Sequence, residues 1–134
     1  VAHEITAQVA RSAVRASTNL PVKYIVVDTL TGRTGRYLAA FRSRKTVVAV
    51  CYTLHAQRIL ALSYGVKPIL RDKSLDDRYH FLADAMEVID ETEQLHDDDL
   101  LVSIGGSFSP ERGASYVEIA CVGDIRERNS HANN

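Results

Sequence analysis

The chain passes from a strand into a helix at Tyr24-Ile25-Val26-Val27-Asp28-Thr29-Leu30-Thr31-Gly32-Arg33-Thr34-Gly35-Arg36. The apolar run at its start predicts a buried strand, and a helical pattern continues to Phe41. The turn between them offers three threonine hydroxyls and the free backbone N–H groups of a new helix, while two glycines open the backbone to a ligand. The helix dipole adds positive charge there, so a phosphate is the natural guest. The pattern alone leaves two readings equally open, a phosphate site and a plain capped helix start.

Length and composition fit one ordinary globular domain. The 134 residues are 46% hydrophobic and 25% charged, with a net charge of −1. This balance indicates neither a nucleic-acid partner nor a membrane partner, and no apolar run is long enough for a transmembrane helix. Cys51 and Cys121 each lie in an apolar strand pattern, so we expect reduced thiols and a cytoplasmic protein. No signal peptide is visible, and the start at Val1 suggests a piece of a longer protein.

Apolar periodicity divides the chain into alternating helices and strands. In the first helix, Ile5, Val9 and Ala13 form the expected buried stripe, with Ala10 and Val14 beside it. Pro68 removes a ladder donor, so its strand is expected at a sheet edge. The expected helices are 3–18, one that follows the threonine turn with its pattern at 37–41, 54–64 and 76–95. The expected strands are 23–28, 46–52, 66–70, 100–104 and 116–122, and a mobile polar tail is expected from 123 onward.

The strand patterns predict the architecture. The first two strands show no polar alternation, which is typical of a parallel sheet covered on both faces. No helix fits between the last two strands, so the last strand is expected to be antiparallel and at an edge. We therefore predict an α/β fold, a three-layer α/β/α sandwich with a five-stranded, mostly parallel sheet, in a domain over 1–124 with a polar tail over 125–134. The threonine turn and the 105–116 loop, which alone reads as a simple hairpin connection, would meet at one edge.

Other motifs give no catalytic centre and no metal site. The turn lacks the glycine patterns of dinucleotide and nucleoside-triphosphate cradles. Cys51 and Arg58 are one residue too far apart for a cysteine-phosphatase loop, so Cys51 is interpreted as a core thiol. Asp28 and Asp72 follow strands as in a phosphoacceptor domain, but the lysine that such a domain needs is missing, because no lysine occurs after Lys73. The carboxylates of 97–99 cannot all face one ion. The five histidines show no ligand spacing, and no nucleophile–base pair can be assembled.

Several segments in order resemble the C-terminal domain of pyruvate kinases. They are Thr29 to Arg36, Ala39-Ala40-Phe41-Arg42, Val47-Val48-Ala49-Val50, Gly65-Val66-Lys67-Pro68-Ile69-Leu70, Asp76-Asp77-Arg78, and Gly106 through Gly113-Ala114-Ser115. The resemblance covers about residues 3 to 124. It implies a five-stranded α/β domain with an antiparallel last strand, as the patterns predict independently.

The resemblance also implies a regulatory role. In that family the domain senses a phosphorylated sugar, commonly fructose 1,6-bisphosphate, and contributes an interface of a homotetramer. The catalytic residues, the magnesium site and the potassium site belong to a separate barrel domain, which would be this chain's partner. The resemblance thus implies no cofactor, no metal site and no catalytic residue within this chain, which alone would be inactive. The alternative is a stand-alone binding or scaffold domain of the same fold with no effector.

Site residues follow from the resemblance by position. One effector phosphate would be cradled by Thr29, Leu30, Thr31, Gly32, Arg33 and Thr34. Arg78 would meet the other phosphate, and the loop with Gly106, Arg112, Gly113 and Ser115 would close over the sugar. The chain departs from the family pattern at Leu30, where some members have lysine, and at Ser115-Tyr116, where the family has threonine–asparagine.

Overall fold

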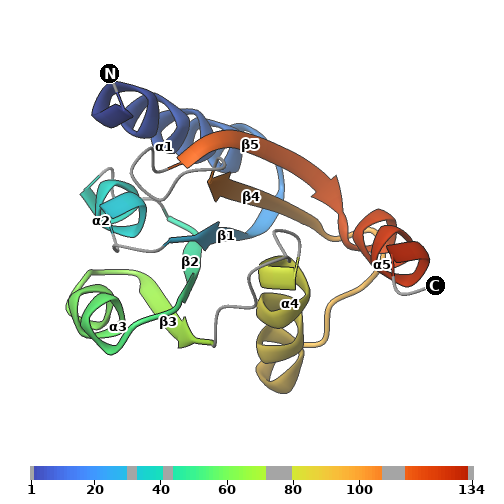
Figure 1. Ribbon diagram of the computed structural model, residues 1–134. Coiled ribbons are helices and arrows are strands. Elements are labelled where there is room, and N and C mark those ends of the chain that lie inside the picture. The colour runs from blue at the N-terminus through green and yellow to red at the C-terminus, as the bar shows by residue number, and fades with distance from the viewer. Residues whose placement is uncertain (1, 30–32, 41–43, 72–79, 107–113, 133–134) are drawn as a thin grey trace.

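The strands of the sheet lie in the order β3-β2-β1-β4-β5 (Figure 1). The computed structural model describes residues 2–29, 33–40, 44–71, 80–106 and 114–132. Strands β1 to β4 run parallel to their neighbours, and β5 is antiparallel to β4 at one edge. The predicted mixed sheet, with β3 and β5 at its edges, is therefore confirmed. The strands are β1 Val22–Asp28, β2 Thr46–Cys51, β3 Val66–Leu70, β4 Leu100–Gly106 and β5 Ala114–Cys121.

Helices cover both faces of this sheet (Figure 1). One core joins α1, α2 and α3 to side chains such as Ile25 and Val27, and the other joins α4 and α5 to side chains such as Val26. Successive residues of β1 therefore enter opposite cores, which explains why the strand is apolar throughout. The helices are α1 Ala2–Asn19, α2 Arg33–Ala40, α3 Leu54–Ala61, α4 His80–Thr92 and α5 Val122–Ala132.

Helix α1 packs through a face of small side chains, which agrees only in part with the predicted apolar stripe. Thr6, Ala10, Ala13 and Ser17 are all at most 3% exposed, whereas Ile5 is 46% exposed. Their spacing of three or four residues places them on one face of the helix, and their small size lets α1 lie close to the sheet. The prediction is confirmed for Ala13 and for Ala10 beside it, and it was wrong about Ile5.

The predicted polar tail is wrong for most of its length, because helix α5 begins directly after β5. Val122 and Ile125 are at most 2% exposed and belong to the same core as α4. Arg126 ties the helix to the loop between α4 and β4, with Nη1 2.8 Å from Asp97 Oδ1 and Nη2 donating to the Leu95 carbonyl over 3.0 Å. Burial of two apolar residues one helical turn apart thus orders a polar segment.

Two helix ends differ from the sequence-based bounds. Helix α3 begins after its N-cap Thr53 and ends at Ala61, three residues earlier than predicted, and Gly65 takes a φ of 73° before β3. The described part of α4 begins at His80, and the predicted start at 76 lies outside the described residues. Among the described helices, none is long and apolar enough to cross a membrane.

Candidate functional site

The carboxyl end of β1 is the point where the chain order of the sheet reverses. From β1 the chain proceeds outward through β2 to β3, and then returns through α4 to β4 on the other side of β1. Helix α2 follows β1 on one face of the sheet, and α4 covers the opposite face. In open α/β sheets, ligands bind in the crevice at such a switch point. The predicted threonine turn leaves the sheet at this crevice.

The described residues of the threonine turn are anchored on both sides. The Thr29 N–H donates to the Val50 carbonyl over 3.0 Å, so Thr29 continues the hydrogen bonding of β1 to β2. Thr29 is 5% exposed, and Thr34, in the first turn of α2, is 3% exposed. Thr29 and Thr34 therefore lie one on each side of the turn. Predicted site residues outside the described part of the chain are Leu30, Thr31, Gly32, Arg78, Arg112 and Gly113, together with the side chains of Arg33, Gly106 and Ser115.

Gly35 serves helix packing. A Cβ at this position would overlap the side chain of Leu60, which is fully buried in α3. Gly35 was expected to open the backbone to a ligand, and the structure instead assigns it to the contact between α2 and α3. The missing side chain lets the two helices approach closely.

A hydrogen-bonded pair that the sequence did not predict lies at the same end of the sheet. The Tyr52 hydroxyl donates to Asp28 Oδ1 over 2.5 Å. Burial and this hydrogen bond both raise the pKa of Tyr52, so the phenol is protonated at neutral pH. The only signal in the sequence was that Asp28 and Tyr52 each stand at the end of an apolar strand pattern. In the structure these two strands, β1 and β2, are parallel neighbours.

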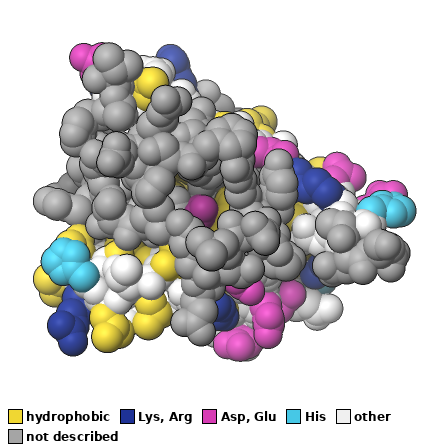
Figure 2. Space-filling model, in the orientation of Figure 1, with side chains coloured by type: hydrophobic (Ala, Val, Ile, Leu, Met, Phe, Trp, Pro, Cys, Tyr) yellow, Lys and Arg dark blue, Asp and Glu magenta, His cyan; other side chains and the backbone are white. Residues whose placement is uncertain are grey.

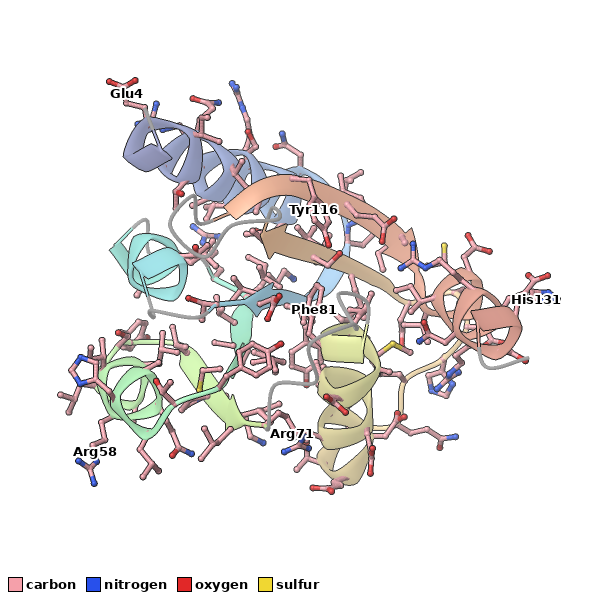
Figure 3. The ribbon with its side chains drawn as sticks, viewed as in Figure 1. Glu4, Arg58, Arg71, Phe81, Tyr116 and His131 are labelled. Atoms are coloured by element: carbon pink, nitrogen blue, oxygen red, sulfur yellow. The ribbon has the colours of Figure 1, made fainter. Side chains whose placement is uncertain are left out.

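On the other side of β1, Tyr116 lies over Gly105. The two residues are opposite each other in the β4–β5 pair, and a Cβ on Gly105 would overlap the tyrosine ring. This cross-strand contact gives a structural role to Tyr116, one of the positions that depart from the family pattern. Figure 3 labels Tyr116 on β5, with Phe81 at the start of α4 and Arg71 after β3.

Two other described polar residues near this edge, Arg71 and Cys51, make structural contacts. Arg71 lies between its own strand and α4, with Nε 3.9 Å from Asp84 Oδ1 and Nη1 donating to the Leu70 carbonyl over 3.0 Å. Cys51 is buried, donates to the Ile69 carbonyl over 3.5 Å, and has a pKa raised by burial, which fits a core thiol. Within the described ranges, no three potential metal ligands come together.

A surface groove of about 420 Å³ lies at the opposite end, beside the starts of β1 and β2. Its carboxylate, Glu93, accepts hydrogen bonds from Lys23 Nζ over 2.9 Å and from the Tyr24 hydroxyl over 2.6 Å. The tyrosine bond is the largest cause of the lowered pKa of Glu93. These polar groups bind one another, so the groove is not the predicted effector site.

Comparison with known proteins gives one consistent family. The family described as "Pyruvate kinase, alpha/beta domain" matches residues 7–120. A pyruvate kinase of Borreliella burgdorferi is 30% identical over 122 residues, covering 89% of this chain and 26% of that protein. One of Lactobacillus delbrueckii subsp. bulgaricus is 30% identical over 121 residues, covering 90% of this chain and 20% of that protein.

A solved structure agrees in fold. The pyruvate kinase of Cryptosporidium parvum superposes with a TM-score of 0.76 at 21% identity, over 87% of this chain and 22% of that one. The chain thus spans about a quarter to a fifth of the length of these relatives. The resemblance seen in the sequence is confirmed, and the chain belongs to the family of pyruvate kinase α/β domains, the C-terminal domain of those enzymes.

Proposed function

We propose that this chain is the regulatory domain of a pyruvate kinase and binds a phosphorylated sugar, such as fructose 1,6-bisphosphate, at the carboxyl end of β1. The observation that carries the proposal is the position of the threonine turn. Thr29 and Thr34 flank a turn that leaves the sheet at its switch point, in a chain of this family. The binding of the sugar would be communicated to the rest of the enzyme.

The start of α2 has the electrostatics that an anion requires. The first N–H groups of a helix lack partners within the helix, and the helix dipole places partial positive charge beside them. The first turn of α2 contains no acidic residue that would compete with a bound phosphate, and it begins with Arg33. A phosphate between Thr29 and Thr34 would receive hydroxyl and backbone donors together.

The parent enzyme would convert phosphoenolpyruvate and ADP to pyruvate and ATP in the cytoplasm. Its catalytic barrel would hold the magnesium and potassium ions, and this chain would contact that barrel and a second copy of itself in an oligomer. The exposed apolar side chains of α3 and the turn after it fit such contacts: Leu54 is 57% exposed, Leu62 90% and Tyr64 78%. Figure 2 shows yellow side chains gathered over α3. Apolar groups gathered on a surface often mark a protein contact.

Calorimetry with fructose 1,6-bisphosphate tests the effector site. We expect the unsubstituted chain to bind, and Thr34→Ala to bind about tenfold more weakly or worse, because one hydrogen bond to a charged phosphate is lost. Thr46→Ala is the matched control, since Thr46 is exposed at the start of β2, at the far end of the sheet. Circular dichroism checks that each variant is folded. A folded, unsubstituted chain that gives no binding heat would refute the sensor.

The exposed side chains of α3 also favour a second candidate, a binding or scaffold domain with no effector. In that case Leu62→Ser should abolish contact with a partner, while fructose 1,6-bisphosphate gives no heat with any variant. Sedimentation of the isolated chain measures whether this surface mediates self-association. Self-association that Leu62→Ser removes, together with silent calorimetry, would favour the scaffold over the sensor.

A further inference from the structure

We propose that a second copy of this chain docks across the β3 edge, with the acidic face of its α4 against the basic and apolar face of α3. The inference rests on the oligomer contact in the proposed function and deepens it, because it names the surface that meets α3. The effector plays no part in it.

Charge is divided between two stretches of the sequence. Between Asp28 and Asp72 the chain contains no acidic residue, and all its charged side chains there are arginine or lysine. From residue 80 to residue 99 it contains neither arginine nor lysine, and all its charged side chains other than histidine are carboxylates. The first stretch includes α3 and β3, and the second includes α4. A chain with a net charge of only −1 thus has one basic and one acidic segment.

Helices α3 and α4 flank the edge strand β3 on opposite faces of the sheet (Figure 1). The carbonyl of Gly65 and the N–H of Arg71 bond to β2, so the alternation of the strand turns Pro68 toward the open edge. Pro68 has no N–H to donate there, which disfavours the addition of another strand. A second copy at this edge therefore meets the two helices.

The exposed stripe of α3 combines apolar side chains with a cation. Leu54 and Leu62, which are 57% and 90% exposed, lie four residues before and after Arg58, and this spacing places all three on one face of the helix. Figure 3 shows Arg58 pointing away from the molecule. Arg58 has no ion-pair partner among the residues that the structure describes. The side chains gathered at α3 in Figure 2 are yellow, dark blue and cyan, whereas magenta ones gather around α4.

The exposed stripe of α4 is complementary to that of α3. Glu87 and Glu91 are exposed and lie one turn apart, with the half-buried Val88 beside them. Within the described ranges, neither glutamate has an ion-pair partner. Arg58 can therefore meet these carboxylates while the leucines beside it cover Val88 and the apolar stems of the glutamates. Opposite charges around an apolar contact steer two surfaces together and fix their register.

A twofold axis at the β3 edge makes this contact twice. Because α3 and α4 flank the same edge, one rotation brings α3 of each copy onto α4 of the other. This is the self-complementary arrangement of a symmetric dimer. Each substitution on either helix then changes both contacts.

The test is sedimentation of the unsubstituted chain, of Arg58→Glu and of Glu91→Arg, each alone and the two variants mixed in equal amounts. Arg58→Glu places carboxylates opposite carboxylates, and Glu91→Arg places cations opposite cations. In the mixture, each contact again joins a cation to a carboxylate. Arg15→Glu is the matched control, because it makes the same change of charge at an exposed position of α1, which packs on β1, β4 and β5 away from β3. Circular dichroism checks the fold of each variant.

We expect the unsubstituted chain to form dimers that dissociate as sodium chloride rises from about 0.05 M to about 0.5 M, because salt screens exposed charges. Each single reversal should weaken dimerisation about tenfold, the mixture should restore it, and Arg15→Glu should leave it unchanged. A folded, unsubstituted chain that stays monomeric at about 1 mM would overturn the inference and leave the α3 surface to the barrel.

Dimers that persist in both reversals, or a mixture that does not recover, would show that α4 is not the partner surface. The inference would then be wrong, while the contact through α3 that Leu62→Ser tests would stand. Calorimetry with fructose 1,6-bisphosphate measures the effector site independently of these results, so the failure of the inference and the failure of the sensor are distinguishable.

Discussion

Gly35→Ala should destabilise the fold, although alanine is the better helix former. The added Cβ would overlap Leu60, a side chain that is fully buried between α3 and the sheet. Overpacking a closed core typically costs about 1–3 kcal/mol, and alanine recovers up to about 1 kcal/mol of helix propensity. We therefore expect a net loss of roughly 1–2 kcal/mol in the free energy of unfolding, measured by urea denaturation.

The same substitution, Gly35→Ala, is then measured in a chain that already carries Leu60→Ala. Removing the leucine side chain costs about 2–5 kcal/mol by itself, but it also removes the group that the new Cβ would meet. In that background Gly35→Ala should be neutral or stabilising by up to about 1 kcal/mol. The change of sign between the two backgrounds is the signature of direct contact.

Gly65→Ala is the matched control for this cycle. Gly65 has a φ of 73°, and nothing lies within 4 Å of the position of an added Cβ. Its substitution should cost about 1–2 kcal/mol through backbone strain alone, by the same amount with Leu60 present or absent. If Gly35→Ala is equally destabilising in both Leu60 backgrounds, the packing role assigned to Gly35 is refuted.

Three other substitutions test separate parts of the fold. The hydrogen bond to Glu93 is the largest cause of the rise in the pKa of Tyr24 from 10.0 to about 12. Because the folded state holds the phenol proton more tightly than the unfolded state, this bond stabilises the fold below pH 10. That stabilisation is lost as the pH rises from 10 to 12. Tyr24→Phe should flatten that part of the pH dependence of unfolding in urea. Ile125→Ala should cost about 2–4 kcal/mol by urea denaturation, whereas no effect would support an unstructured tail. Tyr116→Ala should lower stability by about 0.5–1 kcal/mol and speed amide exchange in β4, because it uncovers Gly105; unchanged exchange would contradict the contact.

Features with a strong local signal could be predicted from the sequence. The apolar run of β1 predicted a strand buried on both faces. Pro68 and the short link before β5 predicted which two strands lie at the sheet edges. Helix α5 has a weak signal, because Ile125 is its main buried anchor in an otherwise polar segment. The face of α1 was predicted only in part: Ala13 is buried as expected, whereas Ile5 is exposed and the polar Thr6 and Ser17 are buried.

Side-chain contacts between distant segments could not be predicted. The pairing of Asp28 with Tyr52 depends on the register of β1 against β2 and on how far the chain continues past each strand. The contact of Gly35 with Leu60 depends in the same way on the packing of two helices. A glycine in a ligand-binding pattern and a glycine in a helix contact look identical in sequence, because both are read only as a missing side chain.

The junction between β1 and α2 therefore divides its residues between the fold and the ligand. The Thr29 N–H is used in the hydrogen bonding of the sheet, and Gly35 is used in the contact of α2 with α3. A phosphate in the proposed site would have to use donors other than these two groups. Such donors hold any phosphate of the right size, so they cannot by themselves choose among phosphate esters. Selection among phosphate esters would therefore require groups outside the turn.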